Sequence, residues 1–130
     1  MSEKQTTLAK DVTLRGKGLH TGVDVTVTFK PAPANSGYRF CRVDLPGNPV
    51  IDAIADNVTE TSRGTTLVQG EASVATIEHV LAAFSGMRID NAMIEIDAPE
   101  APIMGGSSHM FVEAIKEAGI TELKDDRNYY

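Results

Sequence analysis

An amphipathic helix is predicted by the segment Thr76-Ile77-Glu78-His79-Val80-Leu81-Ala82-Ala83-Phe84. Its apolar residues recur at the i, i+3, i+4 and i+7 positions that form one stripe on a helix: Ile77, Val80, Leu81 and Phe84. Because the hydroxyl of Thr76 can accept a hydrogen bond from an unpaired backbone N–H, we expect Thr76 to be the N-cap. The helix should then start at Ile77 and end at Gly86, which suits the left-handed position after a helix.

Two polar residues, Glu78 and His79, fall in the first turn of this predicted helix, outside its apolar stripe. At an N-terminus both side chains can lean past the helix end toward one site in front of it. The positive end of the helix dipole favours an ionised carboxylate and a neutral imidazole. A neutral histidine beside a carboxylate is the ligand and base of many zinc hydrolases. Taken alone, however, the pair is more typical of two solvated first-turn side chains.

Strands are predicted on both sides of this helix. Val23, Val25, Val27 and Phe29 alternate with polar residues, which is typical of a half-buried strand. Residues 38–45 should form the returning strand, 50–55 a third strand, 65–68 and 73–75 a pair, and 92–97 a further alternating strand. A second apolar stripe predicts a helix capped by Ser107 or Ser108 and closed by Gly119: Phe111, Ala114, Ile115 and Ala118.

These elements predict an α+β fold, a two-layer sandwich of a mostly antiparallel sheet with two helices packed on one face. The 130 residues, 42% of them apolar, are enough for one core of ordinary size. We expect one domain over residues 1–122 and a polar linker or frayed end over 123–130. The chain would then stop at a boundary inside a longer protein whose second domain it lacks.

The composition excludes several classes of protein. A net charge of −6 argues against a broad basic surface for nucleic acid or anionic membranes, although a few local cations would serve a small anionic substrate. The single cysteine, Cys41, cannot form an internal disulfide or a cysteine-based zinc site, and we interpret it as a strand residue. Because the sequence has no membrane-length apolar run and no signal peptide, we expect a cytoplasmic location.

Five segments in a fixed order carry a resemblance to a known family. They are Gly16-Lys17-Gly18-Leu19-His20-Thr21-Gly22, Pro31-Ala32-Pro33 with residues 40–45, residues 76–83, Ile89-Asp90-Asn91-Ala92, and Pro102-Ile103-Met104. Together they resemble the N-terminal half of the zinc-dependent UDP-3-O-acyl-N-acetylglucosamine deacetylases of lipid A biosynthesis. The similarity runs from about Thr7 to Ile120, nearly the whole chain.

The resemblance implies two similar α+β domains with an active site between them. The implied reaction removes acetate from the 2-acetamido group of UDP-3-O-(3-hydroxyacyl)-N-acetylglucosamine, a UDP-sugar lipid. His79 matches the zinc ligand that the first half contributes, and Glu78 matches the general base beside it. His20 matches a histidine thought to help hold substrate, although it could equally cap its own glycine-flanked loop. His109 matches no functional position, and we interpret it as a surface residue.

Two departures limit what the chain can do alone. A catalytic zinc generally takes three protein ligands, and the resemblance places the others, with the acyl-chain passage, in the missing C-terminal half. We therefore expect the isolated chain to bind zinc weakly through His79 and to be inactive. The second departure is Gly105, which stands where the family usually has aspartate.

Two alternatives to half of an enzyme remain open. The chain could be a non-catalytic stand-alone domain that binds a UDP-sugar or regulates the full enzyme. It could also be a truncated product that self-associates through the apolar face that would meet the second half.

Overall fold

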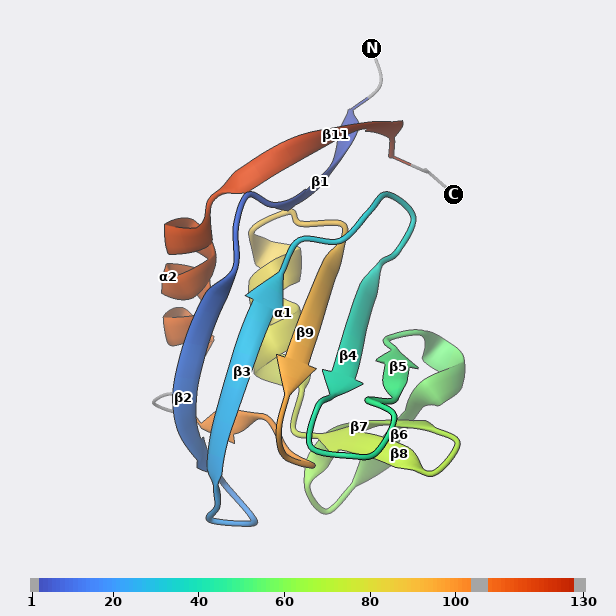
Figure 1. Cartoon of the computed structure of the whole chain (residues 1–130), viewed down its shortest axis with the longest axis vertical. Helices are drawn as coiled ribbons and strands as arrows, with labels where there is room; N and C mark the ends of the chain where they lie inside the picture. Colours follow the sequence, from blue (N-terminus) through green and yellow to red (C-terminus); the bar gives the residue numbers. More distant parts are fainter. Residues whose placement is uncertain (1–2, 104–107, 128–130) are drawn as a thin grey trace.

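The computed structural model describes residues 3–103 and 108–127. Its main layer is a six-stranded sheet in the order β10-β2-β3-β9-β4-β5, and the two α-helices lie together on one face of it (Figure 1). These strands are β2 (Val12–Gly18), β3 (Asp24–Lys30), β4 (Tyr38–Arg42), β5 (Val50–Asp52), β9 (Ala92–Ile96) and β10 (Pro102–Ile103). The predicted α+β sandwich is confirmed.

The strand order differs from the prediction at one place. We expected residues 38–45 to return beside the strand that ends at Phe29, but β9 lies between β3 and β4. β9 pairs antiparallel with β3 and parallel with β4. Parallel neighbours need a long crossover. Here the chain between β4 and β9 contains β5, a small second sheet and the first α-helix.

The second sheet lies at one end of the main sheet and consists of β6 (Val58–Thr61), β7 (Gly64–Gln69) and β8 (Ala72–Ala75), with the short helix η1 (Ala55–Asn57) before it. The predicted pairing of residues 65–68 with 73–75 is confirmed, because Thr66 opposes Ala75 and Leu67 opposes Val74. Gly70 turns this hairpin with a φ of +64°, a conformation that favours glycine.

At the opposite end of the molecule, β1 (Lys4–Leu8) pairs with β11 (Ile120–Asp126) as a two-stranded ribbon (Figure 1). Lys4 lies opposite Asp126, and Leu8 lies opposite Ile120. We expected a linker or frayed end over residues 123–130, but the strand continues through residue 126. Residues 128–130 lie outside the described part of the chain.

The helices are α1 (Glu78–Gly86) and α2 (His109–Ala118). Both predicted stripes pack on the core. From α1 and its cap, Ile77, Val80 and Phe84 are buried, while Leu81 is only partly buried against the core. From α2, the whole stripe is buried: Phe111, Ala114, Ile115 and Ala118. Phe29 of β3 joins the two, with ring centroids 4.8 Å from Phe84 and 6.1 Å from Phe111. The core is therefore continuous between both helices and the sheet.

The helix ends differ from the prediction. Ile77, not Thr76, is the N-cap of α1, and Thr76 has a left-handed backbone with φ +59°. Gly86 is the last helical residue, and the left-handed residue after α1 is Arg88, with φ +60°. Ser108, one of the two predicted candidates, occupies the N-cap position of α2 but its side chain makes no capping hydrogen bond. Ser107 and Gly105 lie outside the described residues.

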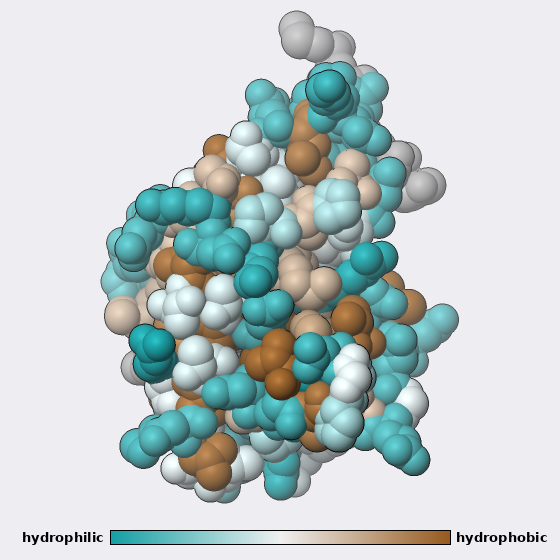
Figure 2. Space-filling view, viewed as in Figure 1, coloured by the Kyte–Doolittle hydropathy of each residue, from teal (hydrophilic) through white to brown (hydrophobic). Residues whose placement is uncertain are grey.

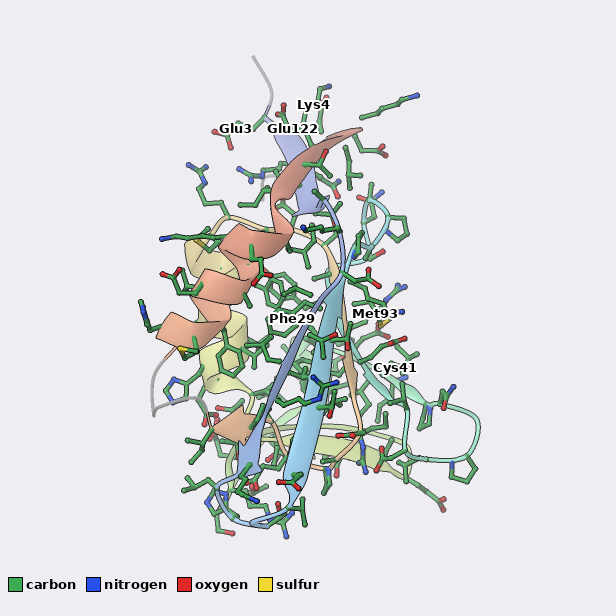
Figure 3. The ribbon with its side chains drawn as sticks, turned by 60° about the vertical axis from the view of Figure 1, so that its left-hand side comes forward. Glu3, Lys4, Phe29, Cys41, Met93 and Glu122 are labelled. Carbon is green, nitrogen blue, oxygen red and sulfur yellow. The ribbon has the colours of Figure 1, made fainter. Side chains whose placement is uncertain are left out.

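The other face of the main sheet is open. Figure 3 shows Phe29 on the helix side of the sheet and Met93 on the opposite side. The open face carries hydrophilic side chains with smaller apolar patches between them (Figure 2). Within residues 3–103 and 108–127, no helix has the length and apolar character needed to cross a membrane.

Candidate active site at the N-terminus of α1

Three segments that are distant in sequence meet where α1 begins. They are the turn between β2 and β3, the hairpin between β6 and β7, and the segment between β9 and β10. This is the lower end of the main sheet in Figure 1, next to the small second sheet. The predicted residues Glu78 and His79 are the first two residues of α1, and His20 lies in the β2–β3 turn. All three therefore belong to the same end of the fold.

The carboxylate of Glu78 is held by the β6–β7 hairpin. The backbone N–H of Thr65 donates to its Oε2 over 2.9 Å. A Cβ on Gly64 would lie only 2.7 Å from Oε1, and Gly64 has a φ of +91°. Glycine is thus required at position 64 both by the backbone and by the close approach of Glu78. One oxygen is fixed by a backbone donor, and the other keeps its lone pairs for a proton.

His79 is exposed on the first turn of α1. Among the described residues, nothing hydrogen-bonds to its imidazole, so both ring nitrogens are available. The same residues contain no group of three His, Cys, Asp or Glu side chains that could hold a metal ion. His79 therefore fits one ligand of a zinc ion, and the described chain does not by itself assemble the three that a catalytic zinc takes.

His20 contacts a residue that the sequence analysis did not single out, Glu100. The Nδ1 of His20 lies 2.5 Å from Oε2 of Glu100. The histidine side chain is 33% exposed, whereas that of Glu100 is fully buried. Glu100 precedes β10, and its backbone lies beside Ala75 in a parallel bridge. The pair thus joins the β2–β3 turn to the segment that leads into α1.

Glu100 accepts several hydrogen bonds at this junction. The donors to Oε1 include the backbone N–H groups of His20 and Thr21, each at 3.0 Å. Burial alone raises the pKa of a carboxyl group, but hydrogen bonds from Thr21, His20 and Thr76 outweigh it and lower the pKa of Glu100 to about 2. Glu100 is therefore an ionised carboxylate at neutral pH, although it is buried.

Thr76 links Glu100 to the start of α1. Its hydroxyl faces two acceptors, the carbonyl oxygen of Arg63 at 2.5 Å and Oε2 of Glu100 at 3.1 Å. A left-handed backbone is costly for a β-branched residue, on the order of 1–3 kcal/mol. These hydrogen bonds, together with the bridge between Ala75 and Glu100, hold Thr76 in that conformation two residues before Glu78.

Sequence reasoning missed Gly64, Thr65 and Glu100. A usable signal existed only for Glu100, which is an acidic residue inside the otherwise uncharged segment Ala98-Pro99-Glu100-Ala101-Pro102-Ile103. Cys41 is a strand residue of β4, as predicted. Burial raises the pKa of its thiol, and so does the neighbouring Glu95, which is the opposite of what activates a nucleophile.

Comparison with known proteins decides the family. The pattern of the LpxC family, described as UDP-3-O-acyl N-acetylglycosamine deacetylase, matches residues 5–130. The chain belongs to this family. The resemblance seen in the sequence is thereby confirmed, and Glu78, His79 and His20 lie within the matched LpxC region.

Individual LpxC relatives match nearly all of the chain. A bifunctional enzyme LpxC/FabZ of Porphyromonas gingivalis is 56% identical over 128 residues, which is 98% of this chain and 28% of the relative. A UDP-3-O-acyl-N-acetylglucosamine deacetylase of Methylococcus capsulatus is 48% identical over 126 residues, 97% of this chain and 41% of the relative. A deacetylase of the same name from Bdellovibrio bacteriovorus is 47% identical over 125 residues, 96% of this chain and 41% of the relative. The chain thus spans less than half the length of these relatives.

Proposed function

We propose that this chain is the N-terminal half of a zinc-dependent amidohydrolase of lipid A biosynthesis. Its reaction would be the removal of acetate from UDP-3-O-(3-hydroxyacyl)-N-acetylglucosamine. The observation that carries the proposal is the pair Glu78 and His79 on the first turn of α1, within a chain of the LpxC family. The remaining metal ligands would come from a C-terminal half.

Glu78 is the proposed general base. Its carboxylate is oriented by the Thr65 N–H at Oε2, while Gly64, which has no side chain, allows Oε1 to approach the hairpin backbone closely. An oxygen placed in this way can take the proton from a water molecule as that water attacks an amide carbonyl. General base catalysis of this kind typically contributes about 10²–10⁴-fold to the rate.

His79 is the proposed zinc ligand of this half. A zinc ion, when bound, lowers the pKa of water toward ~7 and polarises the amide carbonyl. The exposed imidazole of His79, one residue after Glu78, can supply one nitrogen to such an ion. The isolated chain should then bind zinc weakly and should not turn over substrate.

His20 is the proposed substrate-binding residue. Its ring is partly exposed and is anchored at Nδ1 by Glu100, so Nε2 is the nitrogen that can contact a ligand. The ring position is therefore compatible with a substrate contact.

One observation supports a second candidate function. Because residues 3–103 and 108–127 hold no three-residue metal group, the chain could also act as a non-catalytic domain that binds a UDP-sugar or regulates a complete enzyme. In that case Glu78→Gln would leave its function unchanged.

A chimera distinguishes half of a deacetylase from a non-catalytic domain. Residues 1–130 would replace the matching segment of the Porphyromonas gingivalis LpxC/FabZ enzyme, and acetate release from UDP-3-O-acyl-N-acetylglucosamine would be measured. We expect activity in the chimera and a fall of about 10²–10⁴-fold in kcat for Glu78→Gln. Glu95→Gln, on the open sheet face, is the matched control and should retain activity. Full activity of the Glu78→Gln chimera would contradict the proposed base.

A further inference from the structure

The buried carboxylate of Glu100 is held in one orientation. Its Oε1 accepts from two backbone N–H groups, those of His20 and Thr21, and from the Thr21 hydroxyl at 3.2 Å. Backbone donors cannot rotate away, so an acceptor must occupy this position. A Cβ on Gly18 would lie 2.4 Å from the same oxygen, so the turn also encloses it sterically.

The second oxygen faces only side chains. Oε2 lies 2.5 Å from Nδ1 of His20 and 3.1 Å from the hydroxyl of Thr76. An ionised carboxylate can only accept hydrogen bonds. The proton between Glu100 and His20 must therefore reside on Nδ1, and whenever the ring carries only that proton its Nε2 is an acceptor.

We propose that Glu100 is a positioning residue of the LpxC site, which fixes His20 as the Nδ1–H tautomer so that Nε2 accepts a hydrogen bond from the substrate. The inference rests on the proposed substrate contact of His20 and adds that Glu100 determines which nitrogen of His20 makes this contact. The low pKa of Glu100, about 2, supports it because the carboxylate stays ionised throughout the neutral range.

The alternative is a purely structural role, in which Glu100 only ties the β2–β3 turn to the segment before α1. Both roles predict that removing the carboxylate destabilises the fold. They differ in what the tautomer of His20 does, because only the positioning role makes substrate binding depend on a free Nε2 acceptor.

The variant Glu100→Gln should change which ring nitrogen of His20 carries the proton. The two backbone N–H groups need an acceptor at the Oε1 position, so the amide oxygen must lie there. The amide NH₂ then takes the Oε2 position and donates to Nδ1. We therefore expect the neutral ring of His20 to switch from Nδ1–H to Nε2–H.

Nitrogen-15 NMR of histidine-labelled chain, at about pH 8.5 where an ordinary histidine is neutral, reads the tautomer directly. The unmodified chain should show Nδ1–H for His20, and Glu100→Gln should show Nε2–H. Glu95→Gln should leave His20 unchanged. An Nε2–H tautomer in the unmodified chain overturns the proposal without any variant, and so does an unswitched tautomer in a folded Glu100→Gln chain.

The substrate side is tested in the chimera. Glu100→Gln should raise KM for the UDP-sugar lipid about tenfold, the effect of losing one hydrogen bond to a polar group, while kcat changes less. A switched tautomer with unchanged KM would overturn the positioning role and leave the deacetylase proposal intact. An inactive chimera with the expected tautomers would instead contradict the proposed function and leave the link between Glu100 and His20 standing.

Discussion

Each end of the main sheet holds a carboxylate in a hydrogen-bond network, and the two networks are built from different partners. At the end with β1 and β11, Asp90 accepts from Nε of Arg127 at 2.9 Å, and Arg127 also pairs with Glu3 at 2.5 Å. At the end where α1 begins, Glu100 accepts from backbone N–H groups, hydroxyls and the ring of His20.

The difference in partners corresponds to a difference in role: one network stabilises the fold, and the other positions side chains of the candidate site. The arginine network balances charge against charge and ties both ends of the described chain to the turn before β9, which is a stabilising role. The Glu100 network keeps a carboxylate ionised with backbone N–H groups, hydroxyls and one imidazole, and it leaves the second nitrogen of that imidazole available. A buried charge held in this way orients other groups, and through Thr76 it does so two residues before Glu78.

The largest effect on stability should come from Glu100→Gln. The pKa of Glu100 falls from an ordinary 4.5 to about 2 in the folded chain, which corresponds to about 3 kcal/mol of folding free energy at neutral pH. Because the folded pKa is the lower one, this stabilisation is present above pH 4.5 and is lost as the pH falls toward about 2.

Urea unfolding at a series of pH values checks this. The deficit of Glu100→Gln relative to the unmodified chain should be greatest above pH 4.5 and should shrink as the pH approaches 2. A deficit that stays constant across that window would mean that the fold does not stabilise the ionised form of Glu100.

A smaller effect is expected from Gly64→Ala. Gly64 and Gly70 both have positive φ, but an added Cβ meets Glu78 only at position 64 and meets nothing within 4 Å at position 70. Both alanine variants should lose about 1–2 kcal/mol of unfolding free energy from the left-handed backbone. Only Gly64→Ala should also lower kcat of the chimera, by about tenfold, because it displaces Glu78. Equal kcat values for the two variants would show that the β6–β7 hairpin does not position Glu78 for catalysis.

The smallest effect on stability is expected at the end of the main sheet with β1 and β11. Arg127→Met should lower the free energy of unfolding by about 1 kcal/mol at low salt, since ion pairs near the surface contribute little and are screened. Deacetylase activity of the folded chimera should be unchanged. A loss of activity as large as that of Gly64→Ala would show that the Arg127 network also affects the candidate site and does not only stabilise the fold.

Local patterns in the sequence were sufficient for some parts of this fold. The stripe through Ile77, Val80 and Phe84 predicted α1, and the alternation through Phe29 predicted β3, because both depend on periodicity alone. The pairing of β3 with β9 was not predictable in this way, since it depends on which strands meet after a long crossover. The ribbon of β1 with β11 was missed for the same reason, as it joins Lys4 to Asp126.

The candidate site likewise contains residues that a local motif predicts and residues that depend on distant partners. Glu78, His79 and His20 were found from their motif, and their roles remain predictions. Glu100 was missed because nothing in its neighbours along the chain indicates that its partners are His20, Thr21 and Thr76. Thr76 was wrongly expected to cap α1, because its hydroxyl is engaged by Arg63 and Glu100 instead.

The function proposed for this chain requires the start of α1 to contribute a metal ligand to a deacetylase site. The most direct test is the zinc content of the purified chimera with His79→Ala, compared with the matched control His109→Ala on the exposed first turn of α2. Zinc and activity should be lost together in His79→Ala and retained in His109→Ala. Full zinc occupancy in the His79→Ala chimera would show that the start of α1 supplies no ligand to the metal.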